Sequence, residues 1–466
     1  MINLFIYVFI LAILNSVLFY GKDIGINVIL FIIPILSFIY YVLKGNKKIN
    51  NKKGLLFMIP IVLLSLSYLI YDNATFKVLN SIAIIVLFIL MFIYTIYPTY
   101  NLEEIGKRSI SLIFEPLRCI GNVYRLIGNK FNELIKIPSS TKKKIKSIII
   151  IIPIVLLVLI LLTSADMEFN SIFKNFFKLF KNISLDNIIG RIIGILIFFT
   201  YVSSFVNYLV FNYKEEKGSS TFKIDGYTIR LLLIVLNILY IVFDFIQIKS
   251  LVFHHLTMDV SYATYARQGF FQLMFISLIN ISIILISKHN KDNNYNKSIK
   301  YLNIVMILLT AIIIFSSFYR MHMYESAYGY TTLRLLVYVI LFTETILLVP
   351  TFRYVINSKV NILKHFIVVT TSIYTVLGIF PVDYFIASKN IDRYNKTGKI
   401  DIYYLENYNS DNITLLTDLY NSTEDKEIKD ELNLYLREMN TIKNTHGFQE
   451  YNISKKKAYK YLNKIN

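Results

Sequence analysis

The sequence predicts an all-α fold: a polytopic bundle of about 11 transmembrane helices with a small helical extracytoplasmic C-terminal domain. Of 466 residues, 55% are hydrophobic and only 17% are charged, at a mean hydropathy of +0.53. This is more apolar than one soluble core of that length requires. The apolar residues gather in stretches of roughly 20, the length that crosses a hydrocarbon core of about 30 Å. After residue 381 the composition changes to polar residues with short apolar runs.

Eleven apolar stretches are long enough to cross a bilayer. The first begins without a basic leader or a cleavage pattern of small residues, so we interpret it as a retained span. The expected spans are residues 3–20, 26–43, 54–71, 82–97, 147–163, 192–212, 229–248, 268–287, 301–318, 331–350 and 365–381.

Lysine and arginine are distributed unequally between alternate loops. The loops at 44–53, 98–146, 214–230, 288–300 and 353–364 hold 26 of them, and the opposite loops hold 10. Because basic loops stay in the cytoplasm, we expect the N-terminus inside and, after 11 spans, the tail outside. The formal charge of +19 is then a consequence of topology, and no nucleic-acid partner is expected.

The cytoplasmic segment 101–146 is predicted to contain a basic amphipathic helix. Apolar residues from Ile113 to Leu134 recur at steps of three and four, and Pro116 suits the first turn. Interspersed lysines and arginines favour contact with the anionic inner leaflet, either as an in-plane linker or as a regulatory docking element. A smaller apolar stripe at 166–187 predicts a second interfacial helix, on the outer face.

The tail is expected to form three helices. Asp411 can cap the first, and Ser422 or Thr423 can cap a second that runs to about Met439. The third covers about 453–465. The chain is thus divided into an N-terminal four-span unit (1–97), a basic linker (98–146), a seven-span core (147–381) and an extracytoplasmic helical tail (382–466).

Charged residues inside spans are costly and therefore point to function. Asp244 and Glu344 are the only acidic residues inside the expected spans. The topology places Asp244 about one turn below the outer surface and Glu344 roughly 20 Å below it, so we expect no carboxylate pair. Each is interpreted either as a hydrogen-bonding group between helices or as part of a proton or ion relay.

Polar and aromatic residues are dense at the outer ends of spans seven to ten. Arg267, Arg320 and Arg334 lie close to the membrane surface there. Arginine in this position can snorkel, pair with Asp244 or Glu325, or bind phosphate or carboxylate in a bidentate manner. Interfacial anchoring and an anionic-ligand site therefore both remain open.

The sequence offers little for metal or cofactor chemistry. The single cysteine, Cys119, excludes an internal disulfide and a cysteine-rich metal cluster. His254 and His255 are adjacent and lack the spacing that places two ligands on one helical face. We expect no metal and no cofactor. No catalytic residue can be assigned, and the absence of a nucleophile–base pair argues against an enzyme.

Several short motifs at the outer helix ends and at the start of the tail resemble a bacterial family of integral membrane proteins, domain of unknown function 4173, related to group 4153. The resemblance covers roughly residues 150–466. It implies a multi-pass protein of the bacterial plasma membrane and supplies no activity. Met167-Glu168 departs from the family's usual Pro-Val. The motifs are Ala165-Asp166 with Phe169, Tyr265-Ala266-Arg267, Arg320-Met321, Tyr328-Gly329, Leu333-Arg334, Ile386-Ala387, Asn390-Ile391 and Arg393-Tyr394.

These motifs map to the outer side of the predicted topology, where we infer an outward-facing polar surface that could bind a ligand. Three functions remain. The leading one is a non-enzymatic envelope sensor or assembly partner that binds an envelope protein or a lipid-linked ligand. The others are a transporter or flippase of an anionic or lipid-linked substrate, and a membrane-embedded transferase acting at the outer face. The surface comprises Asp166, Asp244, Arg267, Arg320, Glu325, Tyr328, Arg334, Asn390 and Arg393.

Overall fold

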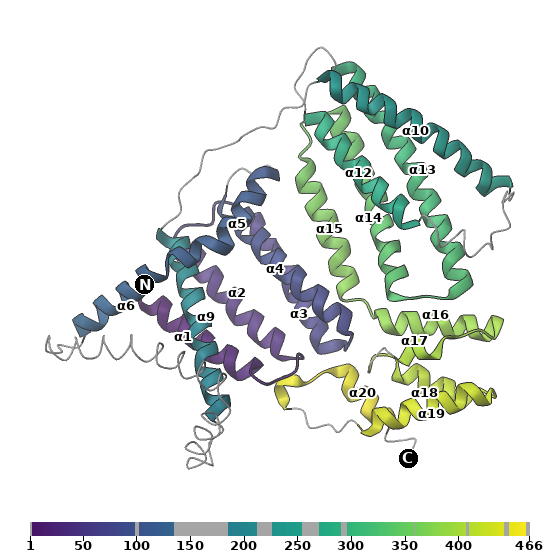
Figure 1. The fold of residues 1–466 in the computed structure, drawn as a ribbon. Helices are drawn as coiled ribbons and strands as arrows, with labels where there is room; N and C mark the ends of the chain where they lie inside the picture. The colour runs from purple at the N-terminus through teal and green to yellow at the C-terminus, as the bar shows by residue number, and fades with distance from the viewer. Residues whose placement is uncertain are drawn as a thin grey trace, which may run out of the picture. The chain divides into compact units, whose positions relative to one another are not determined.

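The structure is a computed structural model, and all regular elements in its described residues are helices (Figure 1). The chain forms two compact units. Unit 1 comprises Met1–Lys22, Ile33–Ile49 and Lys107–Glu216, and unit 2 comprises Asp23–Ile32, Asn50–Gly106 and Lys217–Asn466. The residues described are 2–97, 102–134, 185–211, 226–253, 270–289, 296–357, 359–406, 410–441 and 447–462.

Unit 1 is built around α9 (Leu185–Phe211), against which α1 (Ile2–Phe19) and α6 (Ile120–Leu134) pack. Its buried core includes Val8, Leu11 and Val206. Part of α2 (Asn27–Gly45) and most of α5 (Leu102–Arg118) also belong to this unit.

The predicted amphipathic helix is present but divided, which corrects its expected start. Pro116 lies in the last turn of α5 and not in a first turn. Because proline has no N–H to donate to the carbonyl of Leu112, the helix ends soon after it. Cys119 N–H donates to the Pro116 carbonyl over 2.9 Å, and α6 follows. Ile110 and Phe114 are 62% and 59% exposed, so this segment presents apolar side chains outward.

Unit 2 contains two groups of long apolar helices. One group is a four-helix bundle of α10 (Gly226–Phe253), α12 (Phe270–His289), α13 (Asn296–Tyr328) and α14 (Thr332–Ile356), which surrounds a common apolar core. The other comprises η1 (Lys52–Phe57), α3 (Met58–Ile70), α4 (Ala74–Ile96) and α15 (Ile362–Gly378), with α3 packed between α4 and α15.

The helical membrane bundle is confirmed. Within the described ranges, eight helices are long and apolar enough to cross a membrane. A further pair, α15 and α16 (Val382–Thr397), passes together but bends by 68°. We treat α15 as the span and the polar α16 as its continuation outside it. Helix α1 is apolar but shorter. The expected span 147–163 lies outside the described residues, as does most of the stripe at 166–187.

The tail is helical, as predicted, and has its own apolar core built around Ile386, Leu405 and Leu416. The two predicted caps are wrong. Asp411 does not cap α18 (Ile413–Ser422), which Asn412 precedes without a side-chain cap. The cap of α19 (Lys426–Thr441) is Asp425, whose Oδ1 accepts from the N–H of Glu427 over 3.0 Å. The tail elements are α16, α17 (Ile402–Glu406), α18 (Ile413–Ser422), α19 (Lys426–Thr441), η2 (Phe448–Glu450) and α20 (Ile453–Leu462).

Candidate functional site

Helix α13 is longer than its predicted span. It continues through Tyr328, so the motifs expected in an outer loop are helical. Gly329 then takes a φ of +81°, a left-handed conformation that closes the turn into α14. Thr331 caps α14 by accepting from the N–H of Arg334 over 3.4 Å. The result is a tight hairpin between α13 and α14.

Two arginines occupy the end of this hairpin. The last carbonyls of a helix have no partner within the helix, and here side chains supply donors. Arg393, on α16, donates to the carbonyls of Ser326 (3.4 Å) and Ala327 (2.6 Å). Arg334 donates to the carbonyls of Tyr328 (3.2 Å) and Gly329. A positive charge at a helix C-terminus also interacts favourably with the helix dipole.

The arginine contacts are reinforced by an amide and an aromatic ring. The Arg334 guanidinium lies 4.3 Å from the centroid of the Tyr324 ring. Asn390 of α16 brackets the main chain of Tyr330: its Nδ2 donates to the carbonyl and its Oδ1 accepts from the N–H, each over 2.9 Å. We call Tyr324, Tyr328, Gly329, Arg334, Asn390 and Arg393 the α13 cap; it attaches α16 to the end of the bundle.

The structure thus brings together four residues of the predicted outer surface, namely Tyr328, Arg334, Asn390 and Arg393. Arg320 is buried and donates to Gln247 over 2.7 Å. Glu325 is buried and lies 3.4 Å from His322. Asp244 lies inside the bundle. Asp166 and Arg267 are outside the described residues. A ligand-binding role for this surface stays a prediction.

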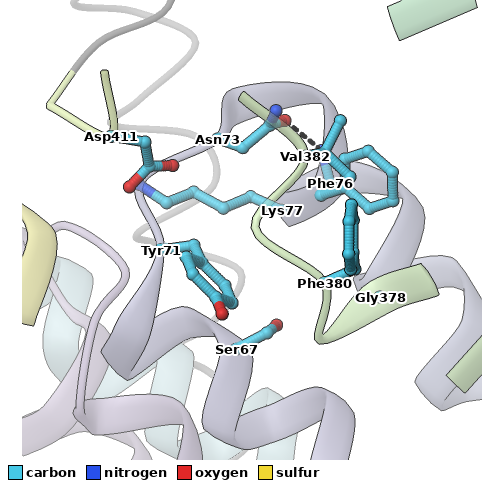
Figure 2. A pocket seen from close by; sticks show the side chains of 9 residues that line it. All are labelled: Ser67, Tyr71, Asn73, Phe76, Lys77, Gly378, Phe380, Val382 and Asp411. Atoms are coloured by element: carbon cyan, nitrogen blue, oxygen red, sulfur yellow. Dashed lines mark hydrogen bonds between the residues drawn. The ribbon is translucent and has the colours of Figure 1, made fainter. Parts of the chain in front are cut away.

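A second polar cluster joins the tail to the turn between α3 and α4. The backbone N–H of Asp72 donates to both carboxylate oxygens of Asp411, at 2.9 Å each. Asp72 in turn accepts from Lys77 (2.6 Å) and Ser410 (3.0 Å) and lies 3.7 Å from Lys455. Figure 2 shows the Asp411 carboxylate and the Lys77 ammonium group facing each other.

Asp383 lies in the first turn of α16 and is 2% exposed. Its Oδ1 accepts from the side-chain amide of Asn73, whose own Oδ1 caps α4 at Phe76. Burial raises the pKa of Asp383 to about 7; nearby Asp411 and Asp72 add to the rise, and the Asn73 bond opposes it. At neutral pH this carboxyl group therefore exchanges between its neutral and charged forms.

We call Asp72, Asn73, Lys77, Asp383 and Asp411 the acidic latch. A small cavity opens beside it, lined by the ends of α3 and α4, the α15–α16 corner and Asp411 (Figure 2). Burial also raises the pKa of Asp411, against hydrogen bonds from Ser454 and the Asp72 backbone. In the described ranges, no group of three or more His, Cys, Asp or Glu side chains is arranged to hold a metal.

A further polar contact holds α20 to the same turn. Asn452 donates through Nδ2 to the carbonyls of Tyr68 (2.9 Å) and Tyr71 (2.8 Å). Its Oδ1 accepts from the N–H of Lys455 over 3.0 Å, which caps α20. We use the name tail junction for the α13 cap, the acidic latch and Asn452 together.

Sequence reasoning missed the acidic latch and Asn452. The available signal was positional: Asp72 and Asn73 stand between two apolar stretches, and Asn452 stands just before a helical one. Asn and Asp favour such helix-start positions. Their partners, however, lie more than 300 residues away in the chain, and no local pattern identifies them.

Comparison with known protein families gives a match. A family model described as "Domain of unknown function (DUF4153)" matches residues 58–419. The resemblance seen in the sequence is thereby confirmed for group 4153, from further toward the N-terminus than expected; the name 4173 is not confirmed. No curated protein and no solved structure matches the chain.

Proposed function

Since the chain belongs to the DUF4153 family, whose description assigns no activity, we propose that it is a non-enzymatic envelope sensor or assembly protein. In this proposal the tail binds the partner. Binding depends on whether the tail is attached to the ends of the spans. The observation that carries the proposal is the tail junction. Hydrogen bonds of Asp411 and Asn452 fasten the tail to the turn between α3 and α4, and those of the Arg393 guanidinium fasten it to the α13–α14 hairpin.

The chemistry of these contacts supports a reversible attachment. Buried polar pairs contribute less net stability than apolar packing of the same volume, but breaking one partner is costly because the other is left unpaired. Such contacts fix one geometry, and their strength depends on the charges of the groups that form them. Asp383 makes the attachment depend on pH, because its pKa of about 7 lies close to neutral pH. Acid favours its neutral form, which the buried site accommodates best.

The arginines of the α13 cap favour this interpretation over anion transport. Arg334 and Arg393 direct their donors at main-chain carbonyls of α13 and its turn. An anionic substrate would have to displace those bonds. The contacts therefore suit attachment of the tail better than repeated loading of a ligand.

The proposal also includes an orientation and two partners. The tail faces outward, where it meets an envelope protein or a lipid-linked ligand. In the same proposal, α5 and α6 lie on the anionic inner leaflet. Support comes from exposed Phe114 and Tyr124 on these helices and from the basic side chains around them, the composition of an interfacial helix.

Photo-crosslinking in living cells tests this function. A photoreactive residue is placed at Leu434 of α19, which is 67% exposed, in the otherwise unaltered chain. The test repeats the experiment with Asp411→Ala, which removes the acceptor of the Asp72 N–H. We expect a defined envelope product whose yield differs between the two.

Asp392→Ala is the matched control, since this carboxylate is 58% exposed and lies on α16. It should leave the product unchanged. If no envelope component is crosslinked in either form, or if Asp411→Ala gives the same yield as the unaltered chain, the tail does not bind a partner in the proposed way.

A further inference from the structure

Buried polar side chains line the interior of the four-helix bundle from one end to the other. On α13, Asn303, Thr310 and Ser317 recur every seven residues and are fully buried. On α10, Asn237 and Asp244 show the same spacing. A seven-residue repeat keeps side chains on one helical face, so these residues face the bundle interior as a stripe.

Hydrogen bonds join the stripes of the neighbouring helices. At one end Ser287 of α12 donates to Asn303 over 2.9 Å. In the middle, Tyr240 donates to Asn280 over 2.8 Å, and Asn280 donates to Thr310 over 3.1 Å. We call the buried polar side chains in the interior of these four helices the polar lane; they include Asn237, Asp244, Asn280, Asn303, Thr310 and Glu344.

The lane reaches across most of a membrane. Its far end is formed by Gln247, which accepts from Ser316 over 3.2 Å and from Arg320 over 2.7 Å. From Asn303 to Arg320 the path along α13 is about 25 Å at 1.5 Å per residue, against a hydrocarbon core of about 30 Å.

Two carboxyl groups in this lane lack the partners that a structural ion pair would provide. Asp244 is 3% exposed, and neither of its side-chain oxygens has a hydrogen-bond partner among the described residues. Glu344 is 1% exposed; Ser277 donates to its Oε2 over 2.5 Å, and its Oε1 has no partner there.

An unpaired carboxylate in such a place is costly, by a few kcal/mol or more, whereas the neutral acid needs only ordinary hydrogen bonds. A carboxyl group held neutral by its surroundings carries a proton that it can give up when water or a charge reaches it. Ser277 contacts Glu344 directly, and the hydroxyl and amide side chains of the same four helices supply further donors and acceptors in the bundle interior.

We propose that the polar lane binds protons and passes them across the membrane, with Asp244 and Glu344 as the protonatable groups. In each passage the neutral acid releases its proton to water on one side, and the resulting carboxylate takes a proton from a hydronium ion on the other side. One positive charge crosses, and both side chains return to their starting state. This activity is independent of the proposed role of the tail.

The whole chain, reconstituted in liposomes with an internal pH-sensitive dye, tests the proposal. A potassium gradient with valinomycin supplies the driving potential. We expect proton uptake above that of protein-free liposomes. Glu344→Gln and Asp244→Asn, made separately, should each lower it about tenfold or more, because the carboxamide cannot release a proton. Asp392→Asn, an exposed carboxylate outside the lane, should leave the rate unchanged.

A second measurement separates loss of the site from loss of the fold. Infrared spectra of the wild type at neutral pH should contain the carbonyl band of a buried, protonated acid. In each lane variant the intensity contributed by the replaced acid should be missing from this band. The variant should still be monodisperse, which shows that its fold is kept. Uptake equal to that of protein-free liposomes overturns the proposal. So does uptake that both variants retain, or uptake that requires sodium in place of protons.

Discussion

Replacing Asp383 by asparagine should remove most of the pH dependence of tail attachment. Asparagine resembles the neutral acid in size and keeps an oxygen that can accept from Asn73. It carries no charge at any pH. In the wild type, the attached tail holds this carboxyl group at a pKa raised from 3.8 to about 7, whereas a released tail exposes it to water.

The sign and size of the effect follow from this difference. Because the attached form binds the proton more tightly, the contribution of Asp383 to attachment is fully present below about pH 4 and is lost as pH rises through about 7. A shift of roughly three pKa units corresponds to about 4 kcal/mol. Asp411, whose pKa burial also raises, changes attachment in the same direction. The ammonium groups of Lys77 and Lys455 face the latch.

Hydrogen exchange of the whole chain in lipid nanodiscs measures the effect. Amide protection in α18 and α20 should fall in the wild type as pH rises through neutrality, after correction for the intrinsic exchange rate, while protection in α13 stays constant. The Asp383→Asn variant should show a much flatter profile, and Asp392→Asn should resemble the wild type. If Asp383→Asn keeps the wild-type profile, the carboxyl group does not govern attachment and the reasoning is refuted.

Three other predictions concern single contacts. Gly329→Ala should destabilise the protein more than Gly398→Ala: both residues have positive φ, but only at 329 would a Cβ collide with the Asn390 amide, so thermal unfolding should show an extra cost of about 1 to 3 kcal/mol. Asn452→Ala should leave two carbonyls and the start of α20 unpaired and make the final helix protease-sensitive, at about 1 to 3 kcal/mol; unchanged cleavage rates would contradict this. Tyr403→Cys, 74% exposed, in a Cys119→Ser background should react with an impermeant thiol reagent in intact cells; protection until lysis would reverse the proposed orientation.

Hydropathy alone predicted the spans well, because apolar stretches of about 20 residues that recur along one chain are too long and too numerous for a soluble core. It failed where the helix leaves the membrane. Residues 319–328 are polar and aromatic, which suggested a loop, but α13 continues because tertiary contacts satisfy its last carbonyls. Polarity shows where the membrane ends and does not show where a helix ends.

The polar sites were only partly predictable for a related reason. Asn390, Arg393 and Arg334 were recognised through short motifs, but the main-chain carbonyls they contact carry no side-chain signature. Asp411 was expected to cap a helix by local rules. Its carboxylate instead receives the N–H of a residue 339 positions away. A local preference is weak when a buried distant donor would otherwise be unpaired.

Helix α13 has a mechanical consequence. Its 33 residues extend about 50 Å at 1.5 Å per residue, well beyond the thickness of a bilayer. This one helix thus carries Asn303 near one end and, near the other end, the carbonyls that accept hydrogen bonds from Arg393. A small rotation of that helix about its axis would displace the hydroxyl groups in the bundle interior and the arginine contacts at its C-terminal end together.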